Sequence, residues 1–95
     1  MTEIEVLRRT LRKNGVSEQL TVAMEECAEL IQAISKIKRY GKEPELIYNL
    51  TEEIADVQII INELLLIFGC KVKVSAWKKY KLERMEKRLE ETENE

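Results

Sequence analysis

The placement of its glycines and of its single proline most constrains how this chain can fold. The chain has 95 residues, and its only glycines are Gly15, Gly41 and Gly69, with Pro44 shortly after the second. So few turn-forming residues argue against a turn-rich β fold. Glycine is common just past the end of a helix, and proline is favoured in the first turn of one. We therefore expect four helices separated by three short breaks.

Apolar residues recur at helical spacing between these breaks, as in Ile4, Leu7 and Leu11 near the start of the chain. A period of three to four residues is typical of an amphipathic helix. Ser17 follows the first break and is expected to cap the second helix. We predict helices over about residues 3–13, 18–40, 45–68 and 72–92.

The third helix is apolar over most of its circumference, which indicates burial on more than one face. A chain of 95 residues is expected to form a single domain, residues 1–95, with a small core that often gains from oligomerisation. The face with Ala55, Ile59 and Leu66 is expected to meet a second subunit. The predicted fold is all-α, with a four-helix bundle-like protomer that assembles into a dimer or a dimer of dimers.

The composition argues against several classes of function. The net charge is -2, so the chain has no general attraction to nucleic acid or to an anionic membrane. The lack of histidine removes Ser-His and Cys-His nucleophile systems and histidine metal ligands. Cys27 and Cys70 are too few for a disulfide framework, and we expect buried free thiols in a reducing cytosol. We recognise no signal peptide, and the apolar run 57–68 is too short to cross a bilayer.

Two pairs of acidic residues carry the strongest chemical signal. Glu26 and Glu29 lie three residues apart in the second predicted helix, and Glu53 and Asp56 do so in the third. Residues at this spacing point to the same side of a helix. At roughly 100° per residue, the acids lie on the same stripes of each helix as the apolar residues further along. A hydrophobic side chain would be expected at those positions.

A carboxylate in such a position is costly unless it is paired or bound to a metal. Oxygen ligands alone suit a hard divalent cation, Mg²⁺ or Mn²⁺, and the interior of a helix bundle is an established place for such a site. The plain alternative is that each acid pair belongs to a solvated, charged helix face. Two pairs on consecutive helices, both continuing a core stripe, favour the metal site.

A basic stripe in the fourth predicted helix is the natural complement of these acids. Trp77, Lys81, Arg84 and Arg88 recur at spacings of 4, 3 and 4 residues. Phosphate oxygens that no metal holds need cationic partners, so these four are candidate substrate-binding residues. The alternatives are that the cations pair with neighbouring glutamates and that the tryptophan belongs to the core.

The ordered acid pairs resemble a known family motif. Glu26-x-x-Glu29 followed by Glu53-x-x-Asp56, on successive helices joined by a short loop, is similar to the ExxE…ExxD motif of the MazG-like all-α nucleoside triphosphate pyrophosphohydrolases. The settings Glu-Glu-x-x-Glu-Leu and Glu-Glu-Ile-x-Asp-Val also match that motif. The likeness covers roughly residues 17–90, nearly the whole chain.

The resemblance implies an α-helical protein that forms a dimer or a dimer of dimers. It also implies Mg²⁺-dependent hydrolysis of a nucleoside triphosphate between the α and β phosphates, giving a monophosphate and pyrophosphate. Glu26, Glu29, Glu53 and Asp56 would then be the metal ligands.

Many members of that family carry a lysine, an asparagine and an arginine on the following helix, at spacings like those of Lys81, Met85 and Arg88. Met85 stands where the asparagine would, so one contact to the base or sugar lacks its counterpart. The chain is also short for the family, which points to a partner subunit for part of the nucleotide pocket.

We therefore expect a Mg²⁺-dependent (d)NTP pyrophosphohydrolase. Glu29 would accept the proton of the attacking water, and Lys81, Arg84 and Arg88 would hold phosphates. The chain contains no GxxxxGK[ST] loop for γ-phosphate hydrolysis. Two alternatives remain: a non-catalytic helical oligomeric interaction module whose acids are ion-paired, and the same scaffold acting on a different pyrophosphate substrate.

Overall fold

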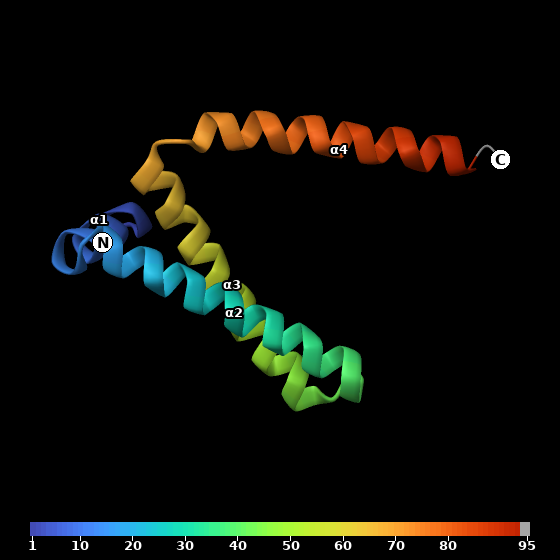
Figure 1. The fold of residues 1–95 in the computed structure, drawn as a ribbon, viewed down its shortest axis with the longest axis horizontal. Coiled ribbons are helices and arrows are strands. Elements are labelled where there is room, and N and C mark those ends of the chain that lie inside the picture. Colours follow the sequence, from blue (N-terminus) through green and yellow to red (C-terminus); the bar gives the residue numbers. More distant parts are fainter. Residues whose placement is uncertain (94–95) are drawn as a thin grey trace.

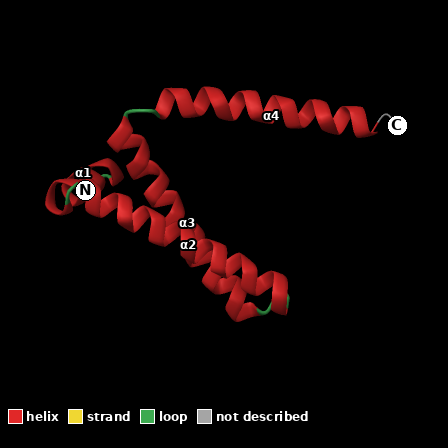
Figure 2. Cartoon of the chain, viewed as in Figure 1, coloured by secondary structure: helices red, strands yellow, loops and turns green. Residues whose placement is uncertain are grey.

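The computed structural model describes residues 1–93, which fold into helices joined by short loops (Figure 2). The prediction of an all-α fold with four helices is confirmed, and the helix ends agree within two residues. The helices are α1 (Glu3–Asn14), α2 (Val16–Tyr40), α3 (Pro44–Phe68) and α4 (Lys71–Glu93).

The glycines and the proline end and begin the helices as expected. Gly15, Gly41 and Gly69 all have positive φ, a backbone conformation that glycine adopts without steric cost. Pro44 is the first residue of α3. The predicted cap at Ser17 is wrong: Gly15 is the N-cap of α2, and its carbonyl accepts the backbone N–H of Gln19 at 3.2 Å. The turn at Gly15 already ends α1, so α2 begins before Ser17 can act as its cap.

The core of the protein is the seam between α2 and α3, which run antiparallel side by side as a hairpin (Figure 1). The seam residues are buried or half-buried and are spaced alternately by three and four, the pattern of a coiled-coil seam. On α2 they are Gln19, Ala23, Glu26, Leu30, Ala33 and Ile37, and on α3 they are Leu46, Leu50, Glu53, Val57, Ile60, Leu64 and Ile67.

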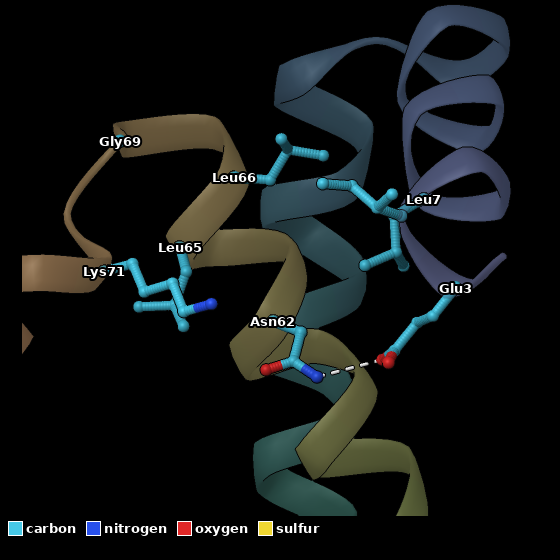
Figure 3. A pocket seen from close by; sticks show the side chains of 8 residues that line it. Glu3, Leu7, Asn62, Leu65, Leu66, Gly69 and Lys71 are labelled. Atoms are coloured by element: carbon cyan, nitrogen blue, oxygen red, sulfur yellow. Dashed lines mark hydrogen bonds between the residues drawn. The ribbon is translucent and has the colours of Figure 1, made fainter. Parts of the chain in front are cut away.

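Helix α1 lies against the hairpin at the end far from the α2–α3 loop. Its Leu7 is buried and points toward Leu66 of α3, and the side-chain amide of Asn62 donates to the Glu3 carboxylate at 2.9 Å (Figure 3). The predicted subunit face that contains Leu66 is thus partly used by α1 within the same chain. Ile59 on that face stays 48% exposed, and its contact with a second subunit stays a prediction.

Helix α4 stands apart from the other three helices (Figure 1). None of its residues from Lys71 to Glu93 is buried. The radius of gyration of the chain is 17.1 Å, against roughly 12 Å for a compact domain of this length. Within residues 1–93, no helix has the length and apolar character that a membrane span requires.

The two cysteines differ from expectation in one respect. Cys27 and Cys70 are both free, as predicted, but Cys27 is exposed and Cys70 only half-buried. Cys27 lies beside the seam line through Ala23 and Glu26, so α3 does not cover it.

Candidate metal centre

The hairpin brings the four predicted carboxylates together. Glu26, Glu29, Glu53 and Asp56 each offer an oxygen atom, and these four atoms lie within 4.8 Å of one another. Glu26 and Glu53 are seam residues on facing helices, which explains the convergence. Glu29 follows Glu26 by three residues, and Asp56 follows Glu53 by three. Each therefore lies on the same side of its helix as the seam acid before it.

Burial differs among the four acids. Glu26, Glu53 and Asp56 are half-buried, whereas Glu29 is exposed at the edge of the cluster. The Oε2 atoms of Glu26 and Glu53 are buried and have no hydrogen-bond partner among the described residues. A buried polar atom without a partner is costly, because it has lost its water and gained nothing in return.

The charged groups that act on Glu26 and Glu53 are all acidic. Burial, followed by repulsion from Glu29 and Asp56, raises the pKa of the Glu26 carboxyl above its ordinary value. Burial, followed by repulsion from Glu29, likewise raises the pKa of Glu53. Every charged neighbour that shifts these two pKa values is itself acidic, so no cation of the described chain offsets the repulsion.

These residues fit a divalent cation. Four carboxylates supply oxygen ligands only, the donor set that Mg²⁺ and Mn²⁺ prefer over softer metals. The two unpartnered oxygen atoms are the groups that a bound cation would satisfy. The exposure of Glu29 leaves one side of the cluster open to solvent.

A cavity of about 240 Å³ opens beside Glu26 and Asp56, between α1 and the hairpin. Its lining includes two buried polar residues, Gln19 and Glu63, which are 4% and 3% exposed. The side-chain amide of Asn14 donates to Gln19 Oε1 at 2.9 Å, and Gln19 Nε2 donates to Glu63 Oε1 at 2.7 Å. This chain of hydrogen bonds gives the cavity a polar wall next to the acids.

Sequence reasoning missed Gln19 and Glu63. The signal was present, because Gln19 precedes Glu26 by seven residues and Glu63 follows Asp56 by seven. Seven residues are two helical turns, so each new residue continues the line of a predicted ligand. Buried polar side chains therefore continue beyond the four acids toward α1.

The predicted substrate-binding residues lie on α4 and do not reach the cluster within one chain (Figure 1). Trp77 is 61% exposed, and its ring packs edge to face on Tyr80 with the ring centroids 5.9 Å apart. The Arg84 guanidinium lies over the ring of Tyr80 at 5.7 Å. Lys81 and Arg88 are exposed on the same helix. The role of these residues in binding substrate stays a prediction.

Comparisons of the chain with protein-family models, with curated proteins and with solved structures found no match. The likeness to the MazG-like hydrolases therefore rests on the acid motif alone. Any function has to be argued from the chemistry of the site.

Proposed function

We propose that the protein is a Mg²⁺-dependent pyrophosphohydrolase that converts nucleoside triphosphates to monophosphates and pyrophosphate. The observation that carries this proposal is the convergence of four carboxylates with two buried, unpartnered oxygen atoms. Such a cluster is costly as a structural feature, and a cation would remove the cost. The motif resemblance supplies the substrate class and the bond that is cleaved.

The position of each acid in the cluster suits it to a different role in the proposed reaction. Glu26, Glu53 and Asp56 would hold the metal together with Glu29. Bound Mg²⁺ would supply positive charge that neutralises phosphate oxygens and lowers the pKa of a water. Glu29, the exposed acid of the four, accepts the proton as the water oxygen bonds to the α phosphorus and the bond to the bridging oxygen breaks. Pyrophosphate leaves with that oxygen.

The nucleoside end of the substrate fits the cavity beside Glu26 and Asp56. Its volume of about 240 Å³ is below the roughly 300 Å³ at which pockets for whole drug-sized ligands begin, so it suits one part of a nucleotide. Gln19 and Glu63 supply the polar wall that a base or sugar needs. The triphosphate would then extend across the four carboxylates.

We further infer that the working form is a homodimer or homotetramer in the cytosol. Large apolar side chains stay exposed on the hairpin: Met24 and Ile31 at 67%, and Ile54 at 42%. Winding both helices at about 100° per residue puts these three side chains on one face, opposite Glu29 and Asp56. Contiguous exposed apolar surface is typical of a contact between proteins. The free cysteines fit a reducing compartment.

The same exposed surface favours the second candidate, a non-catalytic helical interaction module. That reading needs cations to pair with the acids, and within residues 1–93 the charges acting on Glu26 and Glu53 are acidic. A metal that binds only the folded state stabilises it, whereas an ion-paired cluster would gain little.

Phosphorus NMR tests the proposed reaction directly. A panel of canonical and damaged nucleoside triphosphates is incubated with Mg²⁺, and an accepted substrate should give monophosphate and pyrophosphate. Glu29→Gln should slow turnover by roughly 10²- to 10⁴-fold, the usual contribution of a positioned base, with unchanged helical content by circular dichroism. Formation of diphosphate and orthophosphate would show that the reaction class is wrong.

A further inference from the structure

Helix α4 has two chemically different faces. Winding it at about 100° per residue puts Trp77, Lys81 and Arg88 on one side, together with Arg84 and Met85. The glutamates Glu83, Glu86 and Glu90 fall on the other side. From residue 74 to residue 89 this side of α4 is thus apolar and basic, and we call it the basic face; Glu91 follows on the same side near the end of the helix.

The basic face has no surface to pack against within its own chain. Trp77 is 61% exposed, and Met85 and Leu89 are 54% and 59% exposed. A helix in a protein draws most of its stability from the packing of its apolar face. Helix α4 lacks such a packing partner within its own chain. The chain exposes 8021 Å² of surface, against roughly 5,700 Å² for a compact monomer of 11.2 kDa. That excess is in the range that a stable dimer buries.

The hairpin presents the complementary surface. Glu29, Glu52 and Asp56 lie on one side of it, which we call the acidic face, and no described cation offsets the acids in the seam beneath. The first half of α4, residues 71–82, carries five lysines and no acid. Potentials of opposite sign steer two surfaces together and fix their register.

The junction between α3 and α4 keeps α4 apart from the acids of the same chain. Only Gly69 and Cys70 join the two helices. The backbone N–H of Cys70 donates to the carbonyl of Leu65 at 3.3 Å, and the Cys70 carbonyl accepts the first backbone bond of α4 at 2.9 Å. In addition, α1 covers the hairpin between this junction and the acids, where Leu7 lines the cavity beside Asp56. Helix α4 therefore runs at an angle to the hairpin and stands apart from it (Figure 1).

We propose that the basic face of α4 docks on the acidic face of the hairpin in a second copy of this chain. Two copies related by a two-fold axis dock on each other in the same way, so α4 of each copy covers the carboxylates of the other. Lys81, Arg84 and Arg88 of one copy then reach the four carboxylates of its partner, which completes the site. The docking itself rests on exposure and charge, and only the role of these cations toward phosphate rests on the proposed function.

Cross-linking between separately labelled chains tests the docking without any activity. In a full-length Cys27→Ser/Cys70→Ser background, one species carries Lys81→Cys and a second, mass-tagged species carries Glu52→Cys. A short bis-maleimide should give a covalent mixed dimer. Lys79→Cys, on the opposite side of α4, is the matched control and should give at least about fivefold less of the mixed dimer, because its side chain points away from the contact.

Three results would overturn the docking. The first is a cross-link that forms only inside a chain carrying both Lys81→Cys and Glu52→Cys, since α4 would then close on its own hairpin. The second is no cross-link in either arrangement. The third is equal cross-linking from Lys79→Cys, which would mean that the contact does not use the basic face.

Complementation tests whether the docked helix completes the site. Glu53→Gln retains an intact α4, and Lys81→Glu/Arg88→Glu retains intact carboxylates, so each alone should be inactive on a triphosphate that the wild type hydrolyses. An equal mixture should recover roughly a quarter of wild-type activity, because half of random pairs are mixed and each holds one complete site. A mixture no more active than its parts, beside an active wild type, overturns the shared site. If the wild type hydrolyses no triphosphate, the proposed function fails, and cross-linking alone decides the docking.

Discussion

The two halves of the α2/α3 seam share one geometry and differ in chemistry. Near the loop the seam is apolar, with Leu30, Ala33 and Leu50 among its residues. At the other end the same spacing includes Glu26 and Glu53 among residues that are mostly apolar. The apolar half stabilises the hairpin by removing hydrocarbon from water, while the charged half opposes it through burial and repulsion. Acids in the charged half therefore call for an explanation outside stability, and metal binding provides one.

The comparison predicts its largest effect when an acid is put into the apolar half. Ala33 is 2% exposed, so Ala33→Asp would bury a carboxylate with no metal site to hold it. We expect a loss of about 3–5 kcal/mol in the free energy of unfolding, measured by urea titration. Ser35→Asp, at an exposed position of the same helix, should change stability by less than about 0.5 kcal/mol. Equal effects of the two substitutions would mean that the apolar half does not form the core.

A smaller effect should come from the hydrogen bond at the far end of the charged half. Gln19→Leu removes the donor to Glu63, which is 3% exposed and would keep a buried carboxylate without that partner. We expect a loss of about 1–3 kcal/mol by the same titration. The double variant Gln19→Leu/Glu63→Leu should regain most of the loss, because both polar groups are then replaced by apolar ones. A double variant less stable than Gln19→Leu would contradict this account.

The smallest predicted effect is a change in the free energy of unfolding with pH. The folded pKa values of Glu26 and Glu53 lie above the ordinary value of 4.5, so the folded state holds these protons more tightly than the unfolded state. Their contribution is fully present below pH 4.5 and is lost as the pH rises through the folded pKa values. In EDTA, the wild type should lose stability as the pH rises above 4.5. Glu26→Gln/Glu53→Gln should lose less over the same range, and parallel curves would refute the assignment.

The helices could be predicted from the sequence because their signals are local. Gly15, Gly41 and Gly69 end helices through their own backbone conformation, and Pro44 begins one. The meeting of the four acids could also be predicted, since two long helices joined by a short loop must lie antiparallel. The exact start of α2 could not, because the turn at Gly15 replaced the expected cap.

The remainder of the site could not be predicted because it depends on contacts between distant segments. Gln19 and Glu63 become a buried pair only where α1 closes over the hairpin. The position of Lys81 and Arg88 relative to the acids depends on the direction in which α4 leaves α3. Neither residue carries a local signal for that direction, since both would be helical in any arrangement.

The central claim is that the charged half of the seam exists to bind a divalent cation. Titration calorimetry with Mg²⁺, on wild type and on Glu53→Gln, tests it most directly, because the substitution keeps the shape of the side chain and removes its charge. We predict saturable binding to the wild type that Glu53→Gln abolishes, with a matching rise in the wild-type melting temperature alone. Equal binding to both proteins, or no binding to the wild type, would contradict the claim.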